Sequence, residues 1–349
     1  MNRENTFMFK EILEQTSVME SAYKTNISKI KEIVKLFKEK DLSNIYVVAR
    51  GSSNHAGQYF KYLCEVYAHI PVGFIYPSVV TLYGASLNYQ NSLVIGISQS
   101  GSGLDINSVI LDANKSNTLT VSVTNNPDSI VAKSAAIHLH LNVGEEKSVA
   151  ATKTMTSEMY VLALLVMELT NNDELRKELD YKNVQNVILK AIENKENIFD
   201  LAEKCLNYYD AYMLSRGINY VSSLESALKL QETTYVKSKG FAISDFYHGP
   251  FAIVDDKTNI FLLHGKGKDD KDTYEMFDKL RALKANIIVL SNDEHFAKCE
   301  KLIKLPQCSE LISPFAIITS MQLFALGLST AKGLNPDQPR GLKKVTVTK

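Results

Sequence analysis

The chain has 349 residues, which is enough for two domains that each bury a core of their own. Lysine and arginine together number 39, as do aspartate and glutamate, so the formal net charge is zero. This balance gives no reason to expect nucleic acid or an anionic membrane as the main partner. Hydrophobic residues make up 45% and charged residues 22%, which is typical of a soluble globular protein.

Features of secreted, membrane or metal-binding proteins are not found in the sequence. No apolar run approaches the ~20 residues that span a bilayer, and the first ten residues are polar and mixed in charge, unlike a secretory signal. The cysteines have neither metal-ligand spacing nor a disulfide pattern. We therefore expect buried free thiols in a cytoplasmic protein, at Cys64, Cys205, Cys299 and Cys308.

The first half alternates between short strands and helices. Residues 1–24 contain an amphipathic piece that is expected to end near Thr16, and a helix follows from about residue 27 to 40. From there to residue 172 the alternation favours a parallel, doubly wound α/β domain, assigned to residues 25–172. Its strands are expected at residues 45–49, 71–76, 92–98, 118–123 and 137–141.

The second half repeats the pattern after a charged helical connector at residues 173–207. A second α/β domain is assigned to residues 208–332, and a tail to residues 333–349. Both halves show the order strand, glycine-containing turn, helix, which favours an internal duplication. Strands are expected at 211–214, 259–263 and 286–290, and helices from Ser222 to about Lys237, near Tyr274–Leu283, and from Leu311 to Lys332.

Two hydroxyl-rich turns follow buried strands of the first half. One is Gly51-Ser52-Ser53, and the other runs from Ser98 to Gly103 through Gln99, Ser100 and Ser102. Such turns face one crevice at the carboxyl ends of the strands, where a helix N-terminus offers free N–H groups to an anion. Together they predict a phosphate site, although either turn alone also fits an ordinary loop. The small residues of Gly144–Lys153 precede another helix.

Three charged residues share one face of the helix expected after Ser222. Glu225 and Lys229 are spaced i, i+4, and Lys229 and Glu232 are spaced i, i+3. This pattern fits a solvated ladder of ion pairs. Apolar neighbours indicate instead a partly buried face, where a carboxylate can shuttle a proton.

Two further residues are candidates by position. His248 precedes Gly249-Pro250 in an expected loop; a loop histidine is usually a surface residue, but this turn would fix its orientation. Lys344 lies in the basic tail, which fits either solvated charge or a lid over a site.

Six segments occur in the order found in the double-SIS sugar-isomerase family, which the chain resembles over nearly its full length. They are Arg50–Gly57, Ile97–Gly101, Gly144–Lys153, Glu225–Glu232, His248-Gly249-Pro250 and Asn335–Lys344. The chain is similar to the isomerase part of glucosamine–fructose-6-phosphate aminotransferases, without a glutaminase domain, and looks closest to SIS-type glucosamine-6-phosphate deaminases. The resemblance implies an α/β fold of two SIS domains in tandem, each a flavodoxin-like, doubly wound parallel sheet.

The resemblance also implies roles for residues at matching positions. Glu232 matches the carboxylate that moves a proton between C1 and C2, and His248 matches a ring-opening histidine from the neighbouring subunit of a homodimer. Lys344 matches a lysine near the open-chain sugar, in a tail over the active site. The implied substrate-binding residues are Ser52, Ser53, Ser98, Gln99, Ser100, Val149, Ala151, Glu225 and Lys229.

Some positions depart from the family pattern. Gly103 stands where the family often has threonine or serine, so Ser102 or a water is expected to take its place. Asp245 replaces a glutamate, and Ser238-Lys239 replaces an Ala-Glu pair. These changes leave the preference of the second-half pocket open.

The resulting hypothesis is a glucosamine-6-phosphate deaminase that acts on a phosphorylated amino sugar without a metal or an organic cofactor. One alternative is a deglycase of phosphorylated sugar–amine adducts, for which the Ser238-Lys239 change hints at a wider mouth. Another is an ammonia-dependent, aminotransferase-like isomerase. A non-catalytic phosphosugar sensor is disfavoured, because a sensor has no need for Glu232, His248 and Lys344 together.

Overall fold

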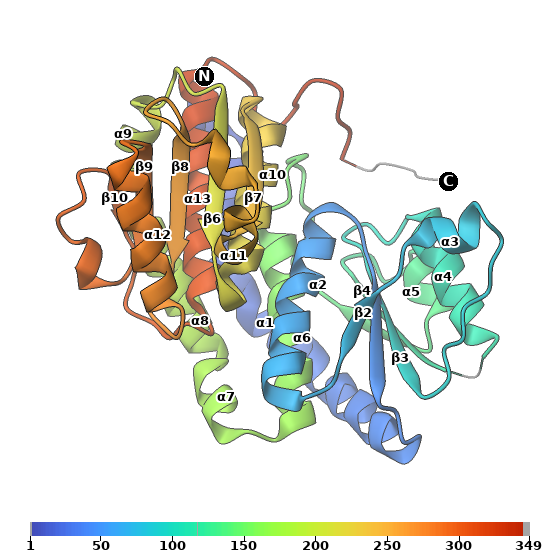
Figure 1. Ribbon diagram of the computed structural model, residues 1–349. Helices are drawn as coiled ribbons and strands as arrows, with labels where there is room; N and C mark the ends of the chain where they lie inside the picture. The colour runs from blue at the N-terminus through green and yellow to red at the C-terminus, as the bar shows by residue number, and fades with distance from the viewer. Residues whose placement is uncertain (1, 117, 345–349) are drawn as a thin grey trace. The chain divides into compact units, whose positions relative to one another are not determined.

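The computed structural model of the protein describes residues 2–116 and 118–344 (Figure 1). The chain divides into two compact units, each built on one five-stranded parallel sheet. Of the described residues, the first-sheet unit comprises 17–146, 153–181 and 343–344, apart from residue 117. The second-sheet unit comprises residues 1–16, 147–152 and 182–342.

The first sheet has the order β2-β1-β3-β4-β5. Its central strand β3 is buried at all six positions, as expected for an apolar, β-branched run covered on both faces. The strands are β1 Asn44–Val48, β2 Val72–Phe74, β3 Ser92–Ile97, β4 Leu119–Thr124 and β5 Ile137–His140. The helices are α2 Gly51–Leu63, α3 Pro77–Thr81, α4 Leu104–Asn114, α5 Ile130–Ser134, α6 Lys153–Thr170 and α7 Asp173–Glu178.

The second sheet has the order β10-β9-β8-β6-β7. Alternate residues of β8 face opposite sides: Leu262 joins the core under α12, and the ring of Phe261 packs against Phe324 of α13. The strands are β6 Asp210–Ser215, β7 Lys237–Ala242, β8 Asn259–His264, β9 Asn286–Ser291 and β10 Leu302–Lys304. The helices are α8 Tyr181–Glu193, α9 Lys195–Glu203, α10 Tyr220–Thr234, α11 Ile243–Tyr247, α12 Asp270–Ala282 and α13 Ser313–Ala331.

The two sheets repeat one topology, in agreement with the expected duplication. Numbered within its own unit, each sheet has the strand order 2-1-3-4-5. The first strand of each ends in an Arg-Gly turn whose glycine has a positive φ, +51° at Gly51 and +60° at Gly217. Each arginine also pairs with an aspartate in the first turn of a later helix: Arg50 with Asp105, and Arg216 with Asp272.

Three expectations about the elements are wrong. A single helix, α1 Phe7–Glu39, replaces the two expected before residue 40, because its sequence contains no proline or glycine to interrupt the hydrogen-bond ladder. The expected boundary after residue 24 therefore falls inside a helix. Strands β7 and β10 were not anticipated, since they are short or polar segments at the sheet edges, where solvent-facing lysines are tolerated. The helix expected to reach Lys237 ends at Thr234.

Helix α13 corrects the expectation that no apolar run approaches the length that spans a bilayer. Among the described residues it is the one helix that is long and apolar enough to cross a membrane, with 19 residues. However, 94% of that window is buried inside the protein, which is the pattern of a core helix.

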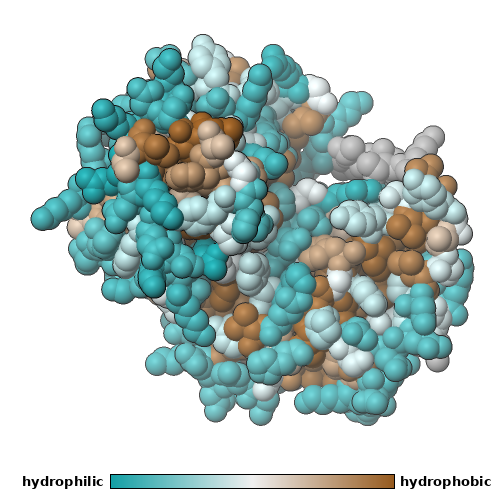
Figure 2. Space-filling view, in the orientation of Figure 1, coloured by the Kyte–Doolittle hydropathy of each residue, from teal (hydrophilic) through white to brown (hydrophobic). Residues whose placement is uncertain are grey.

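Hydrophilic residues cover much of the face shown in Figure 2, with hydrophobic patches between them.

Candidate functional site

Two of the expected phosphate-binding turns meet at the carboxyl edge of the first sheet. They follow β1 and β3, which are neighbouring parallel strands. The Nε of Arg50, in the first turn, donates to Oδ2 of Asp105 at 3.0 Å, and Asp105 lies in α4, directly after the second turn. This ion pair ties the two turns together within the first-sheet unit.

The turn after β3 is shaped by its own backbone. The Gly101 N–H donates to Ser98 Oγ at 3.1 Å, and the Ser102 N–H donates to Ser100 Oγ at 3.3 Å. Gly101 has φ +64°, and a Cβ there would lie 2.0 Å from the Oγ of Ser129, so only glycine fits. Because Ser98 and Ser100 accept these bonds, their hydroxyl hydrogens can be donated to an anion.

The other residues of these turns differ in what holds them. The backbone carbonyl of Gln99 accepts from the Asn125 N–H at 3.0 Å, which fixes the turn against the end of β4. Ser52 is half-buried in the first turn of α2. The hydroxyl of Ser53 is buried and donates to Oε1 of Glu158, in α6, at 2.9 Å. Ser53 therefore braces α2 against α6 with its side chain and can offer its backbone N–H to a ligand.

Lys344 is anchored in the first-sheet unit by a residue that the sequence did not single out. Its Nζ lies 2.6 Å from Oε2 of Glu146, whose side chain is fully buried. The same carboxylate accepts from the Thr154 hydroxyl at 2.7 Å and from the Thr154 N–H at 3.1 Å, at the start of α6. Glu146 lies within the Gly144–Lys153 segment, which was the available signal. Residues 345–349 of the tail lie outside the described residues.

The three charged residues of α10 form a buried set in the second-sheet unit. Lys229 Nζ lies 3.3 Å from Oε1 of Glu225 and 2.6 Å from Oε2 of Glu232. The side chains of Glu225 and Lys229 are 0% and 1% exposed, and that of Glu232 is 20% exposed. Burial alone would lower the pKa of Lys229, but the two carboxylates outweigh it and raise that pKa, so the ammonium stays charged.

Val149 and Ala151 lie in a short segment of the second-sheet unit that two acidic residues hold. Glu11 of α1 is buried and accepts from the backbone N–H groups of Lys147 and Ser148. The backbone carbonyl of Asp337 accepts from the Val149 N–H at 3.4 Å. Neither Glu11 nor Asp337 was expected from the sequence, because each acts through contacts with residues more than 130 positions away.

Asp337 also joins the tail to the start of the chain. Its carboxylate accepts from the N–H groups of Phe7 and Met8 at 2.7 and 2.8 Å, which caps the first turn of α1. Further along the tail, the Arg340 N–H donates to the Tyr235 hydroxyl at 2.9 Å, and the Arg340 guanidinium lies over that ring. The tail therefore packs against the residue directly after α10.

His248 is exposed at the C-terminal end of α11, so the expected loop begins with a short helix. Its backbone N–H donates to the Asp245 carbonyl at 3.0 Å, and Gly249 follows with φ +129°. The part of the chain that the structure describes gives the His248 ring no hydrogen-bond partner. Its ring is accessible at the surface of the second-sheet unit.

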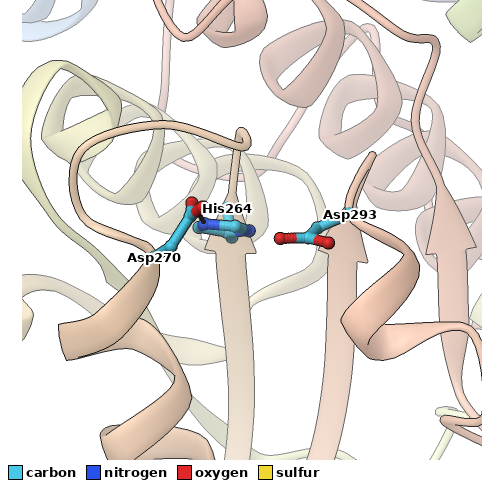
Figure 3. Close-up of side chains that lie close together, drawn as sticks. All are labelled: His264, Asp270 and Asp293. Atoms are coloured by element: carbon cyan, nitrogen blue, oxygen red, sulfur yellow. Dashed lines mark hydrogen bonds and ion pairs between the residues drawn. The ribbon is translucent and has the colours of Figure 1, made fainter.

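His264, Asp270 and Asp293, at the carboxyl edge of the second sheet, lie as close together as the ligands of a metal ion (Figure 3). His264 Nε2 lies 2.9 Å from Asp270 Oδ1, and its Nδ1 lies 3.0 Å from Ser291 Oγ. Asp293 accepts from the Tyr274 hydroxyl and from the His295 N–H. The side-chain atoms of His264, Asp270 and Asp293 that could bind a metal ion therefore have partners within the protein.

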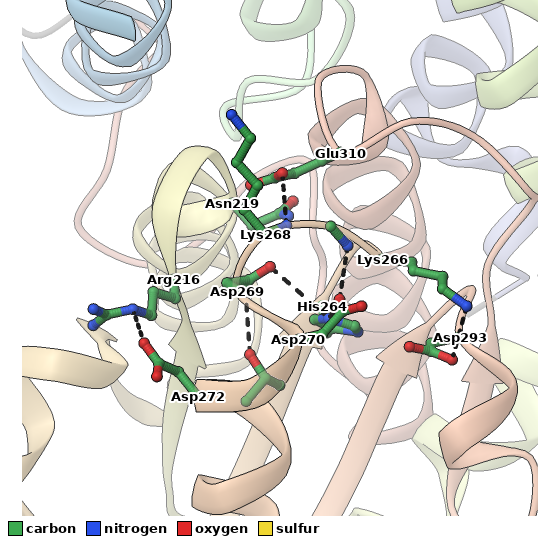
Figure 4. A network of polar contacts seen from close by, with 12 residues as sticks. Arg216, Asn219, His264, Lys266, Lys268, Asp269, Asp270, Asp272, Asp293 and Glu310 are labelled. Carbon is green, nitrogen blue, oxygen red and sulfur yellow. Dashed lines mark hydrogen bonds and ion pairs between the residues drawn. The ribbon is translucent and has the colours of Figure 1, made fainter.

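The charges around this group support a protein-internal network (Figure 4). Lys266 Nζ lies 3.7 Å from Asp293, so an ammonium already supplies positive charge there. Burial lowers the pKa of His264, against the opposing effect of Asp270, and so favours the neutral ring. Burial and the neighbouring Glu310 raise the pKa of Asp269 to about 7. The network ties together the turns that follow β8 and β9.

Residues 36–168, which hold the first sheet and its phosphate-type turns, match the SIS domain family. This part of the chain is an SIS domain. The likeness continues beyond the first SIS domain: an isomerizing glutamine–fructose-6-phosphate aminotransferase of Aquifex aeolicus is 32% identical over 346 residues, 98% of this chain. The chain spans 57% of the length of that relative.

Solved structures show the same architecture over both SIS domains. The C-terminal domain of glucosamine-fructose-6-phosphate aminotransferase from Francisella tularensis has a TM-score of 0.88 at 24% identity, covering 96% of this chain and 98% of that domain. A glucosamine-6-phosphate deaminase from Thermotoga maritima has a TM-score of 0.75 at 20% identity, covering 98% of this chain and 100% of that enzyme. The fold is two SIS domains in tandem.

Proposed function

We propose that the protein deaminates glucosamine 6-phosphate to fructose 6-phosphate and ammonia. The observation that carries the proposal is the buried set on α10. Glu232 keeps one-fifth of its side chain exposed while its partner Lys229 is fully buried. A carboxylate held in this way can exchange a proton with a ligand, and the neighbouring ammonium stabilises the negative charge that it carries between transfers.

Each part of the site has a task in this reaction. The turns of the first SIS domain bind the phosphate, which orients the sugar at a distance from the reacting carbons. His248 moves the proton from the C1 hydroxyl to the ring oxygen, which opens the pyranose. Glu232 removes the proton from C2 and returns it to C1, and a second proton passes from the amine nitrogen to O1. The C1 aldehyde thereby becomes an alcohol, and the amine becomes a C2 imine. Water adds to this imine, ammonia leaves, and the ketone of fructose 6-phosphate remains.

Lys344 is proposed to act near C1 and C2 of the open chain. Its contact with the buried Glu146 supports this, because a positioned ammonium loses less entropy on binding than a free tail lysine. Glu146 would then position Lys344.

A second candidate is the reverse reaction, the amination of fructose 6-phosphate by free ammonia. The name of the aminotransferase relative favours it. The same acid and base would serve, because every proton transfer in the scheme is reversible. The KM values for glucosamine 6-phosphate and for ammonia separate the two candidates, because the equilibrium constant alone fixes the ratio of the forward and reverse specificity constants.

We also propose that the protein works as a homodimer in which His248 completes the site of the partner subunit. The exposed position of its ring supports this arrangement. Mixing His248→Ala subunits with Glu232→Gln subunits tests it, since a shared site restores activity in about a quarter of sites and a self-contained site restores none.

The deciding experiment measures ammonia and fructose 6-phosphate released from glucosamine 6-phosphate, with the N-acetylated sugar as a substrate control. We expect equal release of both products, and a loss of about 10²–10⁴-fold in kcat for Glu232→Gln. The same substitution at the exposed Glu193, at the end of α8, is the matched control and should leave kcat unchanged.

Three outcomes contradict parts of the proposal. Wild-type turnover in Glu232→Gln would disprove its role as proton shuttle. Calorimetric binding of the sugar without turnover would indicate a sensor. Turnover only of phosphorylated sugar–amino-acid adducts would indicate a deglycase.

A further inference from the structure

A cleft of about 460 Å³ opens beside the first turn of α2, next to the end of β2. Its polar walls are a guanidinium, an imidazole and two amides, and its apolar wall includes two aromatic rings. Among the residues that the structure describes, no carboxylate and no residue of the turn after β3 lines it. The residues concerned are Arg50, Asn54, His55 and Gln58 on the polar side, and Phe74 and Tyr76 on the aromatic side.

A second cleft, of about 300 Å³, shares Phe74, Ile75 and Tyr76 with the first. The rest of its lining is mostly apolar and includes Tyr46, Val79 and Leu87. Tyr76 stands at the border with 74% of its surface exposed, so its ring is available to a ligand. A polar cleft rich in donors and an apolar cleft therefore share part of their lining, residues 74–76.

The chemistry of the two clefts selects one class of ligand. Arginine, histidine and amide N–H groups favour an oxyanion, and the positive end of the α2 dipole acts in the same direction. The adjoining rings and aliphatic side chains favour an apolar or planar group. We infer that the paired clefts bind a small anion, a phosphate or a carboxylate, that carries an aromatic or apolar group.

Arg50 connects this site to the phosphosugar turn. Its guanidinium lines the first cleft, and its Nε donates to Asp105, which is buried and lies directly after the Ser98–Gly103 turn. A ligand that engages Arg50 competes with or reinforces this ion pair. Occupancy of the clefts is therefore expected to change the affinity of the turn for a sugar phosphate, and the reverse effect must be equal.

Titration calorimetry with phenyl phosphate and with benzoate tests the inference, and comparison of the two distinguishes a phosphate from a carboxylate site. We expect saturable binding of at least one of them to the purified protein. Tyr76→Ala should weaken it about 2- to 10-fold and leave binding of inorganic phosphate unchanged. Asn54→Ala should weaken the binding of the aromatic probe and of inorganic phosphate by about 5-fold or more. Tyr83→Ala is the matched control, because Tyr83 is 77% exposed and lines neither cleft.

The double variant Ser98→Ala/Ser100→Ala separates this site from the proposed catalytic one. It should abolish binding of glucosamine 6-phosphate and preserve binding of phenyl phosphate or benzoate. Three results overturn the inference: no saturable binding of either probe below about 10 mM, an affinity of about 3 kcal/mol; unchanged binding in Asn54→Ala and Tyr76→Ala; or loss of probe binding in the serine variant. A change of oligomeric state in Tyr76→Ala, measured by light scattering, would assign the clefts to a subunit contact instead and overturn it too. Because binding is measured directly, these outcomes do not depend on the proposed deaminase activity.

Discussion

Replacing Lys229 by methionine removes the ammonium from the buried set on α10 and keeps nearly the same side-chain length. The Glu225 carboxylate, which is 0% exposed, then remains in the core without the cation 3.3 Å away. Breaking a buried ion pair in this way costs about 3–5 kcal/mol of unfolding free energy. Glu232 adds little to this cost, since it is 20% exposed and water screens its charge.

The assay is urea unfolding followed by far-UV circular dichroism, because the chain has no tryptophan to report by fluorescence. Glu225→Gln in the Lys229→Met background removes the stranded charge, and the double variant should recover most of the loss. The loss should also be smaller at pH 5 than at pH 8. A buried carboxylate without its cation has a raised pKa, so it takes up a proton at low pH and its penalty grows as the pH rises.

Two results would refute this reasoning. A loss below about 1 kcal/mol for Lys229→Met would mean that water or movement of α10 solvates Glu225. A loss that is the same at pH 5 and pH 8, and that Glu225→Gln does not repair, would assign the effect to packing alone.

Four other changes have definite expected outcomes. Asp269→Asn should raise Tm more at pH 8 than at pH 5. Burial raises the pKa of the Asp269 carboxyl to about 7, so the charged carboxylate destabilises the wild-type protein increasingly as the pH rises toward and through that value, and the amide removes this charge. An equal shift in Tm at both pH values would contradict this. Asp337→Ala should cost about 1–2 kcal/mol in urea unfolding by removing the cap of α1, whereas a neutral result would show that water replaces the cap. Gly101→Ala should raise the KM for the sugar phosphate with an unchanged CD spectrum, since the new Cβ would lie 2.0 Å from a serine oxygen; an unchanged KM would show that the turn adapts. Glu146→Gln should lower kcat about 10- to 100-fold by releasing Lys344, and wild-type kcat would remove Glu146 from the mechanism.

Much of the fold could be predicted from local sequence patterns. Strand β3 is recognisable because Leu93, Val94, Ile95 and Ile97 form an apolar, β-branched run that only a doubly covered strand accommodates. The charged face of α10 follows from the i, i+3 and i+4 spacing of its residues. The edge strands β7 and β10 could not be predicted in this way, because their backbones pair on one side, β7 carries two lysines and a serine, and β10 has only three residues.

The candidate site, like the fold, was predictable from local sequence only in part. Residue types and their order determined which turns and charged residues to consider, since an anion-binding turn needs small residues and donors at adjacent positions. The tertiary structure alone decided that Glu225 and Lys229 are buried, that Glu146 holds Lys344, and that Glu11 and Asp337 hold the Val149 segment. Each of those contacts joins distant parts of the chain or depends on burial. Hydrogen bonds and desolvation act through space, and the local sequence does not specify which distant group will lie within 3 Å.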